Sequence, residues 1–108
     1  MEPTYRYVEN LSQLIPDIQA DSIISRAFYT GEDANVTLFG FAAGQELTEH
    51  TATRPAILHF IQGEADLTLG TDKTQAGPGT WVHMPPHLAH SIRAKTPVVM
   101  LLILLQGK

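Results

Sequence analysis

Residues 79–94 read GTWVHMPPHLAHSIRA, and this stretch decides how the rest of the chain is interpreted. It carries three of the five histidines, His83, His87 and His90, around the corner Pro85-Pro86. A proline pair fixes the backbone of a turn and excludes a helix through it. The three imidazoles are therefore held at a sharp corner, which is an arrangement typical of a binding or metal site.

Outward from this corner, the chain is a succession of short strand-like segments separated by turns. Glycine-containing turns fall at residues 63–64, 70–73 and 77–79, and Gly40 inside an apolar segment indicates a bulge or a close contact. Eight or nine short strands at this spacing predict an all-β sandwich or barrel, with no helix of three turns. The expected strands are residues 22–29, 35–43, 46–53, 56–62, 65–70, 89–94 and 98–106, with His83 on a further strand.

The length of 108 residues predicts one domain, with a barrel at residues 22–108 and an N-terminal arm of the same domain at residues 1–21. In the arm, Leu11, Leu14 and Ile15 are expected to form a short helical turn that Pro16 ends. The longest apolar run, residues 98–105, is too short to span a bilayer as a helix, which needs about 20 residues, so we expect a buried strand there.

Composition excludes several function classes. The net charge is -4 and the seven Lys and Arg residues form no cluster, so we expect neither nucleic acid nor a membrane surface as a partner. The chain has no cysteine, which excludes disulfides and thiolate metal sites and fits a reducing compartment. The first residues, MEPTYRYVEN, lack the pattern of a secretion signal. We therefore expect a cytoplasmic protein.

His50 and His90 lie 40 positions apart on two different expected strands, and the interior of a barrel brings such distant residues together. Two inward-pointing imidazoles are costly unless each ring nitrogen has a hydrogen-bond partner or a metal. Imidazole is a good ligand for first-row transition metals, so the pair predicts a divalent metal site in which Zn, Fe, Ni, Mn and Cu are not distinguished. The two-residue period of a strand places Glu46, Thr48 and Ala52 on the same face as His50.

Two glycine-to-histidine motifs resemble those of the cupins, and more narrowly the small single-domain conserved-barrel cupins. The first is Gly44-QELTE-His50 with a closing glycine at Gly63, and the second is Gly79-TWVHM-Pro85 continuing to His90. The resemblance covers residues 35–105. It implies a double-stranded β-helix, or jelly-roll barrel, with His50 and His90 at positions where the family carries metal ligands.

The chain departs from the family pattern at four positions. Ala52 stands where the family has its second histidine, and Ala56 stands where it has glutamate. In the second motif, His87 replaces a glycine and Ala94 replaces an asparagine. Two of the usual four ligands are missing, so a third donor must come from His83, His87, Glu46, a partner chain or water.

Three function classes stay open: a metal-dependent enzyme acting on a small molecule, a non-catalytic small-molecule-binding barrel, and an association barrel with a residual pocket. His59 has the opposite parity to Leu58 and Phe60 and is expected to face away from the interior. Strands with apolar residues on both faces exceed what one small barrel interior can bury, which predicts a homodimer. The residues expected to line the pocket are Glu46, Thr48, Ala52, Ala56, Leu58, Phe60, Trp81, Met84 and Ile92.

Overall fold

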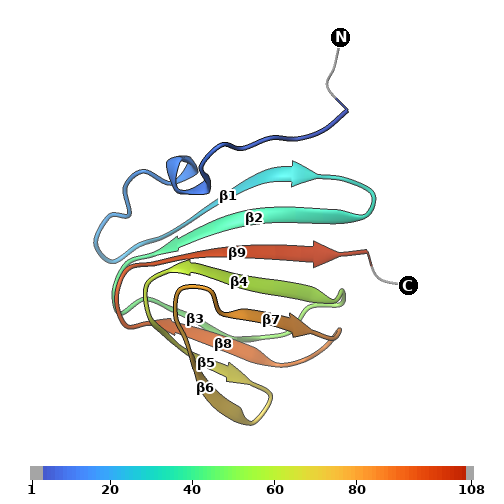
Figure 1. The fold of residues 1–108 in the computed structure, drawn as a ribbon. Helices are drawn as coiled ribbons and strands as arrows, with labels where there is room; N and C mark the ends of the chain where they lie inside the picture. Colours follow the sequence, from blue (N-terminus) through green and yellow to red (C-terminus); the bar gives the residue numbers. More distant parts are fainter. Residues whose placement is uncertain (1–3, 107–108) are drawn as a thin grey trace.

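The structure is a computed structural model that describes residues 4–106, and it consists of two antiparallel sheets (Figure 1). One sheet has five strands in the order β1-β2-β9-β4-β7, and the other has four in the order β3-β8-β5-β6. The all-β fold expected from the turn spacing is confirmed. The strands are β1 (Ile23–Thr30), β2 (Ala34–Phe41), β3 (Glu46–His50), β4 (Ala56–Gln62), β5 (Ala65–Leu69), β6 (Asp72–Ala76), β7 (Trp81–Met84), β8 (His90–Ala94) and β9 (Val98–Leu105).

The main hydrophobic core lies between the two sheets, and buried residues alternate with more exposed residues along the strands that enclose it. On β4, Ala56, Leu58 and Phe60 are buried while Ile57 and His59 are only partly buried. On β8, Ile92 and Ala94 are buried on the same side. Alternate residues of a strand point to opposite faces, so each sheet contributes one apolar face to a shared interior. The expectation that His59 faces away from this interior is confirmed.

Gly63 allows the β4–β5 turn to approach the start of β9. Its φ is 91°, and a Cβ at this position would overlap the carbonyl oxygen of Pro97 and lie 2.8 Å from the Cα of Val98. Only glycine satisfies both the left-handed backbone and this close contact. The closing glycine of the first motif is therefore a packing requirement between two connections that join the sheets.

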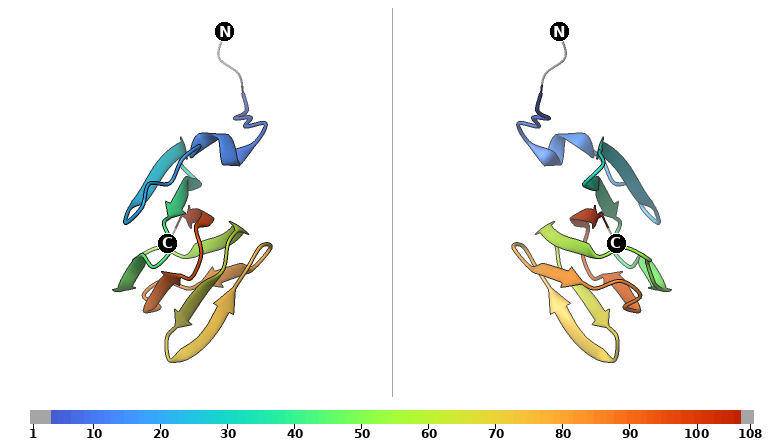
Figure 2. Two further views of the ribbon diagram at one scale, coloured as in Figure 1. Left: turned by 90° about the vertical axis from the view of Figure 1, so that its left-hand side faces the viewer. Right: turned by 90° about the vertical axis from the view of Figure 1, so that its right-hand side faces the viewer.

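The N-terminal arm lies against the outside of the five-stranded sheet, as the side views show (Figure 2). It contains the 3-10 helix η1 (Leu11–Leu14), where the Asn10 side chain accepts a hydrogen bond from the Ser12 backbone N–H at 3.0 Å. A Cβ at Gly40 would lie 3.0 Å from side-chain carbons of Ile15 and Ile18. The helical turn and the close contact at Gly40 are both confirmed, because Gly40 makes room for the arm.

Most expected strand boundaries differ from the structure by one or two residues. The largest difference is in β3, which ends at His50 instead of residue 53, and the turn expected at residues 70–73 is only two residues long. Asp72 pairs with Leu69, so β5 and β6 form a hairpin around Gly70-Thr71. The proposed limits 1–21 and 22–108 include residues 1–3 and 107–108, which lie outside the described residues. Within residues 4–106, no helix has the length and hydropathy to cross a membrane.

Candidate functional site

A register shift in β3 places His50 beside His90. Leu47 pairs with Ile92 and His50 pairs with His90, so three residues of β3 match two of β8. This β-bulge moves His50 to the face that His90 shares with buried Ile92. The expectation that Glu46 and His50 share a face is therefore wrong, because the bulge breaks the two-residue period between them. Glu46 instead pairs with exposed Arg93 on the outer face of the sheet.

The two imidazoles form a contact pair with centroids 4.1 Å apart and planes inclined by 59°. Nδ1 of His50 lies 2.8 Å from the carbonyl oxygen of Thr48, and Nδ1 of His90 lies 2.9 Å from that of Leu88. A carbonyl oxygen only accepts, so each Nδ1 must carry the proton and donate it. Each neutral ring then keeps its free lone pair on Nε2, and both rings are held in the same tautomer by the backbone.

His90 is the buried member of the pair, with 6% of its surface exposed, whereas His50 is exposed. Burial lowers the pKa of His90 below its ordinary value of 6.5, the hydrogen bond to the Leu88 carbonyl opposes this, and the nearby His50 lowers it further. His90 is consequently a neutral imidazole near neutral pH. The pair combines one ring inside the barrel with one at its surface.

This pKa shift predicts an acid-sensitive fold in metal-free protein. Below pH 6.5 the unfolded chain binds a proton at His90 more readily than the folded chain does. The free energy of unfolding should therefore fall as the pH drops below 6.5, by up to about 1.4 kcal/mol per pH unit for this one proton, and level off below the folded-state pKa. Urea unfolding of chelator-treated protein measures this slope. A His90→Gln variant should lose it, and an unchanged slope in that variant would contradict the assignment.

The other two corner histidines do not join the pair. Met84 is buried in the core, so His83, its neighbour on β7, points to the opposite face, where it pairs with Ile57. His87 is exposed and has a φ of 69°, taking the left-handed turn position where the family pattern has glycine. Its backbone N–H donates to the Ala52 carbonyl at 2.7 Å, which ties the corner to the chain just after β3. Within residues 4–106 no group of three or more His, Cys, Asp or Glu side chains is arranged to hold a metal.

The residues expected to line a pocket divide into three sets. Five of them fill the hydrophobic core, and Phe60 among them has no exposed surface, so they support the barrel from within. Trp81 is 59% exposed on the outer face of the five-stranded sheet, because it pairs with outward-facing His59. Glu46 and Thr48 are exposed, and Ala52 is partly buried beside the corner. The core set is Ala56, Leu58, Phe60, Met84 and Ile92.

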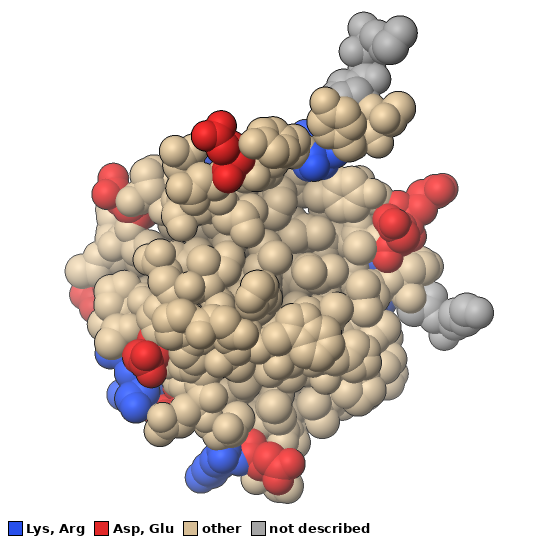
Figure 3. Space-filling model, viewed as in Figure 1, with Lys and Arg blue, Asp and Glu red and all other residues tan. Residues whose placement is uncertain are grey.

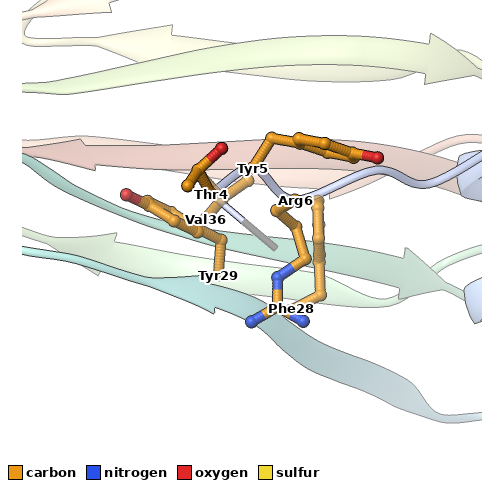
Figure 4. A pocket seen from close by; sticks show the side chains of 6 residues that line it. All are labelled: Thr4, Tyr5, Arg6, Phe28, Tyr29 and Val36. Atoms are coloured by element: carbon orange, nitrogen blue, oxygen red, sulfur yellow. The ribbon is translucent and has the colours of Figure 1, made fainter. Parts of the chain in front are cut away.

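Surface hollows were not anticipated from the sequence, and two of them lie on different sheets. One, of about 540 Å³, lies between the arm and β1–β2 and is lined by Tyr5, Arg6, Phe28 and Tyr29 among others (Figure 4). The other, of about 360 Å³, lies on the outer face of the four-stranded sheet. It is lined by three cross-strand neighbours of alternating charge, Glu46, Arg93 and Asp66, and by Lys73 of β6. The only signal of this hollow in the sequence is that these side chains fall at outward positions of separate strands.

Comparison with known proteins agrees with a small all-β barrel. The sequence profile of the cupin domain matches residues 37–104. This chain belongs to the cupin family, and it is a small single-domain member. The resemblance stated from the two motifs is therefore confirmed, together with the jelly-roll barrel. No match was found among curated proteins.

Solved structures show the same fold. A cupin superfamily protein from Desulfitobacterium hafniense is 28% identical over 97% of this chain and 94% of that chain, with a TM-score of 0.84. A conserved protein of unknown function from Streptococcus pyogenes is 24% identical over 98% and 92%, also with a TM-score of 0.84. The salicylate 1,2-dioxygenase from Pseudoaminobacter salicylatoxidans is 12% identical over 87% of this chain and 30% of that chain, with a TM-score of 0.71.

Proposed function

We propose that this cupin binds a small molecule beside His50 and His90 and that the two imidazoles supply two ligands to a divalent transition metal. The observation that carries the proposal is the shared tautomer of the pair. Each Nδ1–H donates to a backbone carbonyl, at 2.8 Å for His50 and 2.9 Å for His90, which leaves each Nε2 lone pair available. A hydrogen bond from the non-ligating nitrogen is how metal-ligating histidines are usually oriented.

The Nε2 atoms of His50 and His90 are suitable as two of the ligands of a first-row transition metal. Both donors are imidazole nitrogens, which suit Zn, Fe, Ni and Cu and exclude none of the ions expected from the sequence. Burial lowers the pKa of His90, and this keeps the ring unprotonated when it must ligate. A bound metal would supply Lewis-acid polarisation of an oxygen on the small molecule.

Among the candidates for a third ligand, His87 is better supported than His83. Its backbone is tied at 2.7 Å to Ala52, two residues after His50, whereas His83 lies on the opposite face of the five-stranded sheet. Even with His87, the protein supplies one ligand fewer than the four of the family pattern. The remaining positions are open to the small molecule and to water, which makes the bound molecule itself part of the coordination sphere.

A non-catalytic binding barrel is the second candidate. Ala52 and Ala56 occupy the positions of two family ligands, and buried Ala56 belongs to the hydrophobic core. Loss of two ligands favours binding over turnover, because a catalytic centre usually holds its metal by three protein side chains. In this case the histidine pair serves as a hydrogen-bonding site, with two Nε2 acceptors facing a ligand that carries hydroxyl or amino donors.

Metal analysis of protein from metal-replete expression tests the proposal. Wild-type protein should contain metal near one equivalent per chain, and a His50→Ala/His90→Ala double variant should contain almost none. His83→Ala is the matched control, since it removes an imidazole from the same corner but from the other face, and it should keep the metal. His87→Ala should weaken metal binding if His87 is the third ligand. Metal-free wild-type protein would reject the metal site and leave the non-catalytic candidate.

We also propose a domain organisation, a cellular location and an oligomeric state for this protein. Residues 1–21 act as an arm of the single domain formed by residues 22–108, which the packing of Ile15 and Ile18 on Gly40 supports. The protein works in the cytoplasm, which the lack of cysteine supports. It associates as a homodimer, which the apolar outer residues of β4 and β9 support.

A further inference from the structure

Two neighbouring hollows lie where the N-terminal arm runs past β1, the edge strand of the five-stranded sheet. One has a volume of about 540 Å³ and the other about 520 Å³, and both volumes are typical of small-molecule sites. The hollows share Arg6 of the arm with Phe28 and Tyr29 of β1, so together they form one surface, which we call the arm groove. Its aromatic and basic members are Tyr5, Arg6, Tyr7, Arg26, Phe28 and Tyr29.

A β-bulge in β1 turns two consecutive aromatic side chains into the arm groove. The pairing of β1 with β2 is regular up to Ala27 and resumes at Tyr29, so Phe28 is an extra residue on β1. Phe28 packs against the apolar cluster beneath the arm, and Tyr29 lines both hollows beside it. In a regular strand two consecutive side chains would point to opposite faces. The bulge therefore gives the groove two adjoining aromatic walls from one strand.

One of these walls is held in place by its neighbours. The Tyr29 hydroxyl donates a hydrogen bond to the Asp33 carboxylate at 3.3 Å. A Cβ at Gly31 would overlap the Tyr29 hydroxyl, so the ring uses the space that this glycine leaves. By contrast, Tyr5 and Tyr7 of the arm are 73% and 72% exposed and are free to move. The groove thus combines an oriented wall on β1 with aromatic side chains on the arm that are able to close over a bound molecule.

The arm groove is basic although the whole chain is acidic. Arg6 and Arg26 both line it, and none of its lining residues is Asp or Glu. Arg26 donates one hydrogen bond, of 3.4 Å, to the Leu14 carbonyl, and within residues 4–106 neither arginine forms an ion pair. Figure 3 shows basic atoms beside the arm at the top of the view. A guanidinium has five N–H donors, so both arginines keep donors for a ligand.

Two guanidinium groups beside aromatic rings are suited to a planar aromatic anion. The donors of arginine match the two oxygens of a carboxylate, and aromatic side chains pack on a flat ring in offset or edge-to-face geometry. Figure 4 shows the Arg6 side chain extending from the arm alongside Phe28, so a charged and an aromatic group meet in one hollow. The lining includes no glycine and no helix N-terminus of the kind that phosphate sites use, which favours a carboxylate over a phosphate.

We propose that the arm groove binds a small aromatic carboxylate, with Arg6 and Arg26 at the carboxylate and Phe28 and Tyr29 at the ring. This is a second binding site. It lies between the arm and β1, whereas the histidine pair lies where β3 meets β8 in the other sheet. The inference therefore goes beyond the function proposed above and does not depend on a metal.

The probe for this site is 2-naphthoate, which combines a flat aromatic ring with a carboxylate. Isothermal titration calorimetry of the wild-type protein compares it with two analogues. It should bind at least about 10-fold more tightly than 2-naphthalenemethanol, which has the same ring without the charge, because hydrogen bonds to charged groups are the stronger ones. It should also bind more tightly than cyclohexanecarboxylate, which has the charge without the aromatic ring.

Variants of the two arginines locate the binding. Arg6→Gln and Arg26→Gln should each weaken binding of 2-naphthoate about 3-fold or more, since both side chains are exposed and their charges are partly screened. The double variant should bind 2-naphthoate no better than 2-naphthalenemethanol. Arg93→Gln is the matched control, because it removes an exposed arginine from the four-stranded sheet and should leave binding unchanged. Circular dichroism checks that all variants are folded.

Two results would overturn the inference. The first is that 2-naphthoate does not bind, or binds equally well to wild type and to the Arg6→Gln/Arg26→Gln variant. The second is that its binding is lost in the His50→Ala/His90→Ala variant and kept in the arginine double variant. This second result would assign the probe to the histidine pair and leave the function proposed above standing. Metal analysis of the histidine variants is independent of both results, because it reads the other site.

Discussion

Replacing Gly63 by alanine is expected to lower the free energy of unfolding by about 3–5 kcal/mol. The new Cβ would overlap the Pro97 carbonyl oxygen and approach the Val98 Cα to 2.8 Å, and both neighbours are backbone atoms at the start of a central strand. Neither is able to rotate away as a side chain would. Relief of the overlap must separate the β4–β5 turn from β9, whose first residues Val98 and Val99 are buried.

Gly79→Ala is the matched control for this prediction. Gly79 has the same φ of 91°, but a Cβ there would meet nothing within 4 Å. It should therefore cost only the conformational penalty of a left-handed residue, about 1–2 kcal/mol. Urea denaturation followed by circular dichroism gives both free energies. Equal losses in the two variants would show that backbone conformation, and not the contact with Pro97, makes glycine necessary at position 63.

Local patterns in the sequence predicted much of the fold. Alternation along β4 identified the inward set and the outward orientation of His59, because residues 56–59 pair without a register shift with both β7 and β9. The same rule failed on β3. There the bulge between Leu47 and His50 changes the phase, and a bulge depends on the register with β8 and has no signature in the ELTEH segment itself.

The candidate site was predictable only in part for a related reason. The spacing of glycines and histidines identified His50 and His90 as site candidates, and the fold places their ring centroids 4.1 Å apart. It did not resolve the role of His83, since that depends on which face of β7 is inward. Met84 fills the core and sends His83 and Trp81 outward. Nearness in sequence to the Pro85-Pro86 corner was thus a poor guide to nearness in space.

Replacing Phe60 by alanine is expected to lower the free energy of unfolding by about 3–5 kcal/mol. Phe60 has no exposed surface and packs among the residues that fill the space between the sheets. Its removal leaves a cavity enclosed by apolar side chains, which water does not stabilise. If Phe60 instead lined an open ligand pocket, the shortened side chain would be replaced by solvent and the loss would be well below this range.

Trp81→Ala is the control that distinguishes a packed core around Phe60 from an open ligand pocket, because Trp81 lies on the same sheet. Trp81 was expected to line the same pocket, yet it lies on the opposite face of the five-stranded sheet and is 59% exposed. Measured by circular dichroism at concentrations low enough to favour monomer, its replacement should cost less than about 1 kcal/mol. A loss as large as that of Phe60→Ala would contradict the assignment of Phe60 to the core and Trp81 to the outer surface. A small loss for both would reopen the barrel interior as a ligand cavity, because an aromatic side chain whose removal is nearly free is not filling a packed core.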